Sequence, residues 1–177
     1  MLASFRQSLW NQFGASIDSL YDAIALWPEE CWHTDKRFFY SAYHALLFLD
    51  YYLSIPPTDF SSPFPFTLTS PSDIPVNAID DLVPDKIYSK NELSEYLDFC
   101  RQKCHKVISA LTEENMIARW IDRSDDIAAR DTFNFTVFEI LLYNMRHVQH
   151  HTAQLSMLLR QKINQAPEYH THVKDGL

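Results

Sequence analysis

The chain has 177 residues, of which 46% are hydrophobic and 14% aromatic, a composition that supports one folded domain and argues against a disordered chain. It contains only two glycines, which argues against glycine-rich phosphate loops, a Rossmann turn and a sheet built from tight hairpins. The formal net charge of −8, with basic residues scattered singly, argues against a nucleic-acid-binding surface.

The first part of the chain predicts two helices. Over residues 2–26 apolar residues recur at alternating steps of three and four, which places one apolar stripe along a helix. This helix should end before Pro28, because the residue that precedes a proline is disfavoured in the α conformation. A second helix is expected over residues 35–54 and is closed by Pro56 and Pro57.

A long connection follows over residues 54–88, and it holds most of the chain's nine prolines. Long connections without secondary structure are uncommon in compact domains and usually form a lid, a site-covering loop or a crossover. The aromatic residues Phe60, Phe64 and Phe66 indicate that this connection packs against the helices. A roof over a site and an oligomer interface both remain open as its role.

Two further helices are predicted in the second half of the chain, and each begins at a capping-box pattern. The S-x-x-E pattern at 89–92 precedes a helix over residues 90–111. The T-x-x-E pattern at 136–139 begins a last helix that runs to about residue 164. Because a long second connection can span the molecule, the second and third helices can run parallel.

These elements predict an all-α fold, a four-helix bundle with a long proline-rich connection between helices two and three. Between the last two helices, residues 115–123 predict one or two turns of helix and residues 122–131 a solvated acidic loop. Residues 1–166 are expected to form a single helical domain. Residues 167–177 are expected to form a C-terminal tail, frayed and polar, that includes His170 and His172.

The three cysteines, an odd number, favour reduced thiols in a cytoplasmic protein over a disulfide scaffold. No run of about eighteen apolar residues occurs, and the N-terminal segment has no long uninterrupted apolar region, so neither a membrane span nor a signal peptide is expected. Cys100 and Cys104 lie four residues apart on the third helix. Metal or redox chemistry is one interpretation of this pair, but free cysteines are among the most buried residues, which favours a core position.

The segment "RHVQHHTAQLSMLLR", residues 146–160, carries three histidines on the last helix. Residues four apart lie on one helix face, so His147 and His151 should point toward the core, whereas His150 lies about 100° from His151 and falls on the flank. Two histidines at this spacing can bind a first-row metal ion. The alternative is that each core-facing histidine is satisfied by a neighbouring hydroxyl or carbonyl group.

His44 is a third candidate, on the second helix. Tyr40, Leu47 and Tyr51 share its face, which is apolar or aromatic. An unpaired buried polar group costs on the order of 1–3 kcal/mol, so a histidine there needs a hydrogen bond or a metal ion. Three protein ligands with an open position are typical of a catalytic metal site. We therefore expect the second and last helices to bring three histidines together.

The segments "YHALLFLDYYL" and "HVQHHTAQLSMLLR" resemble the DinB/YfiT-like proteins. The last-helix pattern of that family is H-x-x-x-H followed by a small residue and Gln-Leu, which is matched here by His147, His151, Ala153, Gln154 and Leu155. The resemblance spans most of the chain and includes Trp32 before the second helix. This chain departs from the family at Ala153, where glycine is common, and that change leaves the histidines untouched.

The resemblance implies an up-down-down-up bundle, often a homodimer, that binds a divalent metal ion, nickel or zinc, through His44, His147 and His151. Some relatives are thiol-dependent transferases or isomerases. The first hypothesis is therefore a metal-dependent hydrolase or thiol-dependent transferase that activates water or a small thiol toward a small-molecule substrate. The alternatives are a non-catalytic metal-binding protein and a helical interaction protein whose histidines belong to the core. Gln154, on the same face, either orients a ligand or packs.

Overall fold

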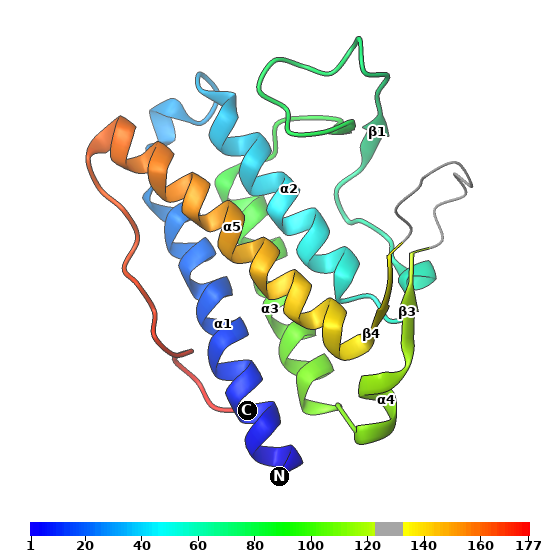
Figure 1. Ribbon diagram of the computed structural model, residues 1–177. Coiled ribbons are helices and arrows are strands. Elements are labelled where there is room, and N and C mark those ends of the chain that lie inside the picture. Colours follow the sequence, from blue (N-terminus) through cyan, green and yellow to red (C-terminus); the bar gives the residue numbers. More distant parts are fainter. Residues whose placement is uncertain (123–132) are drawn as a thin grey trace.

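The computed structural model describes residues 1–122 and 133–177 (Figure 1). Within these residues the chain is mostly helical, as predicted. The helices are α1 (Leu2–Leu26), α2 (Lys36–Tyr52), α3 (Lys90–Ser109), the short α4 (Glu113–Ile117) and α5 (Val137–Ile163), with 3-10 turns at Glu29–Cys31 and Pro57–Asp59. The four long helices match the four predicted ones, and their ends differ from the predicted ends by no more than two residues.

The long helices pack on one another in pairs: α1 against α3 and α5, and α2 against the same two. In Figure 1, α2 and α3 run in one direction, and α1 and α5 run in the opposite direction. The connection between α2 and α3 therefore brings the chain back to the end at which α2 began. This is the parallel course that the length of the connection allowed.

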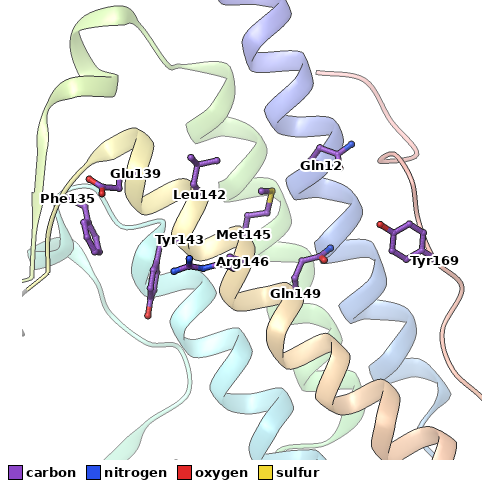
Figure 2. Close-up of a pocket in the computed structure, with 9 residues that line it drawn as sticks. All are labelled: Gln12, Phe135, Glu139, Leu142, Tyr143, Met145, Arg146, Gln149 and Tyr169. Carbon is purple, nitrogen blue, oxygen red and sulfur yellow. The ribbon is translucent and has the colours of Figure 1, made fainter.

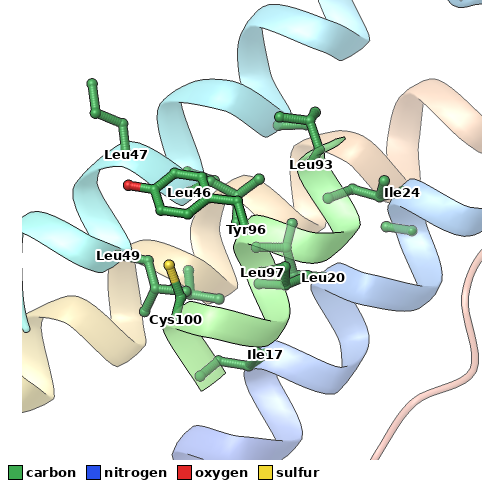
Figure 3. Packing of buried hydrophobic residues seen from close by; sticks show 14 of the residues in the cluster. Ile17, Leu20, Ile24, Leu46, Leu47, Leu49, Leu93, Tyr96, Leu97 and Cys100 are labelled. Carbon is green, nitrogen blue, oxygen red and sulfur yellow. The ribbon is translucent and has the colours of Figure 1, made fainter. Parts of the chain in front are cut away.

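The core lies between these helices, and Figure 3 shows part of it. All four long helices contribute side chains to it, and those labelled in Figure 3 include Ile17, Leu20, Ile24, Leu46, Leu49, Leu93 and Leu97, all at most 1% exposed. Cys100 and Cys104 are fully buried in the same core. Burial raises the pKa of both thiols well above the ordinary value, so the core interpretation of this cysteine pair is confirmed.

Both predicted capping boxes are present. The Ser89 hydroxyl accepts the Glu92 backbone N–H at the start of α3, and the Glu92 carboxylate accepts the Ser89 backbone N–H in return. Thr136 and Glu139 make the reciprocal pair at the start of α5. These contacts satisfy N–H groups that have no partner inside a helix.

Two short antiparallel hairpins were not predicted. β1 (Phe66–Leu68) pairs with β2 (Leu82–Pro84), and β3 (Arg119–Ile121) pairs with β4 (Asn134–Thr136). The helical prediction is therefore wrong for the β3 residues, where pairing with a segment distant in the chain overrides local propensity. Trp120 of β3 is fully buried and donates its indole N–H to the Ser54 carbonyl at the end of α2. The acidic loop predicted over 122–131 lies, apart from Asp122, outside the described residues.

The long connection packs against the helices, as its aromatic residues predicted. The Phe64 ring lies edge-on to Tyr96 of α3 with centroids 4.9 Å apart, and Tyr43 of α2 donates its hydroxyl to the Phe64 carbonyl at 3.2 Å. Within the part of the chain that the structure describes, none of the helices combines the length and the apolar composition that crossing a bilayer requires.

The C-terminal tail is not frayed, and that prediction is wrong. Trp10 of α1 donates its indole N–H to the Asp175 carbonyl, and the Asp175 carboxylate pairs with Arg101 of α3. His170 lies 2.6 Å from the Asp22 carboxylate. Gly14 explains the close approach, because a Cβ at this position would lie 2.5 Å from Cγ2 of Val173. The missing side chain leaves room for the tail along α1.

Candidate metal centre

The three predicted histidines lie together where α2 faces α5. Nε2 of His147 is 3.2 Å from Nε2 of His44 and 3.1 Å from Nε2 of His151. One ring nitrogen from each residue lies within 4.8 Å of the other two. Nitrogens bound to one zinc ion at about 2.0–2.1 Å would be separated by similar distances.

Helix periodicity and one interhelical hydrogen bond produce this convergence. His147 and His151 occupy the face of α5 that also carries the fully buried Ile140 and Leu155. Asn144, one turn before His147, is fully buried and donates its amide N–H to the Leu49 carbonyl of α2 at 3.0 Å. This bond joins α5 to α2 one turn away from His147, next to the point where His147 and His151 face His44.

Two of the imidazoles are neutral at pH 7. Burial, reinforced by the neighbouring imidazoles His151 and His44, lowers the pKa of His147 to about 3. Burial, followed by the effect of His44, lowers the pKa of His151 to about 4. The neutral ring carries a free lone pair, which is the form of histidine that binds metal ions.

The remote nitrogens of two histidines face polar partners. His151 Nδ1 lies 2.9 Å from Gln154 Oε1, and Gln154 Nε2 lies 3.0 Å from Nε2 of the exposed His150. Gln154 therefore holds His151, and His150 stands on the flank as predicted. On the other helix, His44 Nδ1 lies 2.8 Å from Asp80 Oδ2. The two atoms are in close contact, but His44 Nδ1 makes no hydrogen bond among the described residues, so the contact is an approach of a carboxylate to the ring and not an aligned hydrogen bond.

These partners determine where the ring protons lie. A lone pair on His44 Nδ1 would face the Asp80 carboxylate unfavourably, so this contact favours the tautomer with the proton on Nδ1 and a bare Nε2. The amide oxygen of Gln154 has the same effect on His151. His147 Nε2 can donate one proton to only one of these two bare nitrogens, and its own Nδ1 is buried without a partner among the described residues. A cation at the point of convergence would satisfy all three Nε2 lone pairs, so the donor set fits a divalent metal ion.

Aromatic rings surround the three histidines. The Phe48 centroid lies 4.6 Å from that of His44 and 5.7 Å from that of His147, and the Tyr52 centroid also lies 5.7 Å from His147. Tyr51 donates its hydroxyl to Asp122 Oδ1 at 2.5 Å and is thus engaged away from the histidines. The site is consequently walled by apolar surface, which strengthens electrostatic interactions inside it.

A cavity of about 560 Å³ lies on the outer side of α5 and contains none of the three histidines. Figure 2 shows the side chains that line it, from α5, β4, α1 and the C-terminal tail. Tyr143 lines this cavity and also stacks beside His147, with ring centroids 6.4 Å apart. A single aromatic ring therefore borders both the cavity and the histidines.

Sequence reasoning found all three histidines and Gln154 but missed Asp80. Helix periodicity groups residues on one helix, whereas Asp80 reaches His44 from the long connection. Its only signal in the sequence is a carboxylate in a segment expected to pack against the helices.

The fold and the site define a mostly helical protein with a three-histidine group able to hold a metal ion. No protein-family model, curated protein or solved structure matches the chain.

Proposed function

We propose that this chain is a four-helix bundle of up-down-down-up topology, like the DinB/YfiT-like proteins, that binds one divalent metal ion through His44, His147 and His151. The observation that carries the proposal is the convergence of three imidazole nitrogens, with Nε2–Nε2 distances of 3.1 and 3.2 Å. The contacts of His44 with Asp80 and of His151 with Gln154 support it, because they place ring protons on the far side of each ring.

Zinc and nickel are the ions that we propose, since imidazole ligands suit both. Three neutral ligands leave the charge of the ion uncompensated and a coordination position free. When bound, such an ion lowers the pKa of a water molecule or thiol in that position and so supplies a nucleophile near neutral pH.

We therefore propose a metal-dependent hydrolase or thiol-dependent transferase that acts on a small electrophilic substrate. The residues of this chain would contribute orientation and exclusion of water. Gln154 holds the ring of His151, and the rings of Phe48 and Tyr52 cover the histidines on the apolar side. The side chain of His44 retains 13% exposure, which leaves one edge of the group open to a ligand.

A structural role for the ion is the second candidate. His151 is only 5% exposed, and the three ligands come from two different helices, so an ion there would join α2 to α5. Turnover on a panel of electrophiles, with water or with low-molecular-weight thiols, separates the two roles. A purely structural ion would raise the unfolding temperature without supporting turnover.

By the resemblance we also propose a cytoplasmic homodimer. The exposed apolar side chains Leu142 and Met157 on the outer side of α5 are compatible with a contact between copies. Light scattering after size exclusion tests this proposal, and a mass of one chain at working concentrations would contradict it.

Elemental analysis of protein purified without a histidine tag tests the central proposal. We expect about one zinc or nickel ion per chain, and one equivalent of added Zn²⁺ should be retained by metal-stripped protein after desalting. Absence of stoichiometric binding in both measurements would rule out the metal centre.

A further inference from the structure

Asp80 belongs to the long connection between α2 and α3 and links this segment to the three histidines. Its Oδ2 lies 2.8 Å from Nδ1 of His44, and its Oδ1 accepts the backbone N–H of Leu82, the first residue of β2, at 3.1 Å. The Asp80 side chain is 27% exposed and that of His44 is 13% exposed. One carboxylate thus faces the ring of a helix residue and is held by the backbone of a strand.

We propose that Asp80 is a positioning residue for the metal centre: it fixes the ring of His44 and makes metal binding depend on the docked position of the connection. This inference rests on the proposed function. It gives the connection a role in metal binding. The sequence alone left two roles open for this connection, a roof over the site and an oligomer interface.

The physical basis is the pairing of a carboxylate with the remote nitrogen of a metal-binding imidazole. Such a carboxylate keeps the proton on Nδ1, directs the Nε2 lone pair toward the ion and raises its basicity. Gln154 performs the equivalent task for His151. His44 is the one ligand on α2, its Nδ1 makes no hydrogen bond among the described residues, and Asp80 Oδ2 faces that nitrogen at 2.8 Å. Its orientation therefore depends on the connection.

The hairpin of β1 and β2 holds Asp80 in place. Leu82 pairs with Leu68, and the Thr69 backbone N–H donates to the Asp81 carbonyl at 2.9 Å beside it. Because coupling between two binding events is reciprocal, metal binding should stabilise the docked hairpin by as much as the docked hairpin favours metal binding. The two events are then linked through one carboxylate.

The neighbouring residue supplies a matched control. Asp81 is exposed and adjacent to Asp80, so Asp81→Asn makes the same change in charge at nearly the same place, while its backbone hydrogen bond is kept. Asp80→Asn retains only one carbonyl oxygen, which cannot accept from Leu82 and face His44 equally well. Asp80→Glu restores the carboxylate on a longer side chain.

Zn²⁺ affinity, measured by competition with a chromophoric chelator, is the first readout. We expect Asp80→Asn to weaken Zn²⁺ binding about 10- to 100-fold, as for other carboxylates behind metal-binding histidines, with Asp81→Asn within about twofold of the unaltered protein and Asp80→Glu between them. The visible spectrum of the Co²⁺-loaded protein should shift in Asp80→Asn and not in Asp81→Asn. Circular dichroism shows whether each variant keeps its helices. If Asp80→Asn has lost them, Asp80→Glu takes its place in the comparison with Asp81→Asn.

Hydrogen exchange is the second readout. Zn²⁺ should slow backbone exchange over residues 66–84 in the unaltered protein and in Asp81→Asn, and should have little effect there in Asp80→Asn. Equal Zn²⁺ affinities and equal Co²⁺ spectra for the two asparagine variants would overturn the role of Asp80 while leaving the metal centre intact. Failure of the unaltered protein to bind Zn²⁺ would overturn the metal centre and this inference together.

Discussion

Two buried polar clusters lie on different sides of α2, and they are built in opposite ways. Toward α3, the Asp50 carboxylate, 2% exposed, accepts from the Tyr96 hydroxyl at 2.8 Å and from Lys103 Nζ at 2.5 Å. Lys103 also donates to the Ser54 hydroxyl at 2.7 Å. Toward α5, His44, His147 and His151 direct ring nitrogens at one another.

The two clusters differ in whether every buried polar group has a partner within the protein; we call a cluster complete when it does. In the Asp50 cluster, donors meet acceptors and a negative charge meets a positive one, so the protein itself satisfies the buried groups. In the histidine cluster, three ring nitrogens converge, at most one of the two contacts of His147 Nε2 can be a hydrogen bond that it donates, and His147 Nδ1 is buried without a partner among the described residues. A complete buried cluster holds helices together, whereas an incomplete one of this kind indicates a ligand.

The strongest test of this contrast removes one ligand at a time. His44→Ala, His147→Ala and His151→Ala should each weaken Zn²⁺ binding by more than about 100-fold, because loss of a direct ligand exceeds the 10- to 100-fold cost of losing a partner behind it. His150→Ala is the control, since its side chain is exposed on the flank and should change affinity little. Chelator competition measures all four, and equal effects for His150 and His147 would contradict the ligand assignment.

A substitution in the complete Asp50 cluster should lower the stability of the protein and leave its metal affinity unchanged. Lys103→Met leaves the Asp50 carboxylate buried without its cation, and we expect this to lower the free energy of unfolding by about 3 kcal/mol. This value is at the lower end of the range for a broken buried ion pair, because the Lys103 side chain is 25% exposed. Urea denaturation measures the loss. Lys106→Met, an exposed lysine on the same helix, is the control, and a loss of equal size there would show that the buried pair contributes nothing specific.

The pH dependence of stability should reveal the neutral histidines in metal-free protein. Their pKa values in the folded state are lowered from an ordinary 6.5 to about 3 for His147 and about 4 for His151. Between about pH 4 and 6.5 the unfolded chain binds protons that the folded chain does not, so stability should fall as pH decreases through this range.

Urea midpoints recorded with a chelator present measure this slope. The double variant His147→Gln, His151→Gln should flatten it, and His150→Gln, which alters an exposed neighbour, should leave it nearly unchanged. A slope that persists in the double variant would assign the effect to other groups.

Periodicity within a helix explains what could be predicted from the sequence. His147 and His151 share a face because they lie one turn apart, and His44 was found because the residues around it on α2 are apolar. The capping boxes are equally local, with partners three residues apart. Each of these inferences needs only the geometry of a single helix.

Contacts between distant segments explain what could not be predicted. Asp80 meets His44, and Arg119 meets Asn134 through a side-chain hydrogen bond of 2.8 Å within the β3–β4 hairpin, at positions that no local pattern connects. The packed C-terminal tail was missed for the same reason, because its polar composition gave no sign of the close approach of Val173 to Gly14 on α1. The convergence of the three histidines was thus predictable, and the groups that orient or surround them largely were not.

The smallest expected effect comes from a change that touches neither cluster. Gly14→Ala places a Cβ 2.5 Å from Val173 Cγ2, which should push the tail off α1, whereas alanine favours the helix by about 0.5–1 kcal/mol over glycine. These effects oppose one another, so the net change in stability should stay within about 1 kcal/mol. Backbone exchange over residues 170–177 should nevertheless rise, and Zn²⁺ affinity should not change. Val173→Gly removes the clashing atoms. Backbone exchange over residues 170–177 in the double variant Gly14→Ala, Val173→Gly should therefore be close to that in the single variant Val173→Gly. A large loss of Zn²⁺ affinity in Gly14→Ala would mean that the tail supports the metal centre, and the contrast between clusters would then have to include α1.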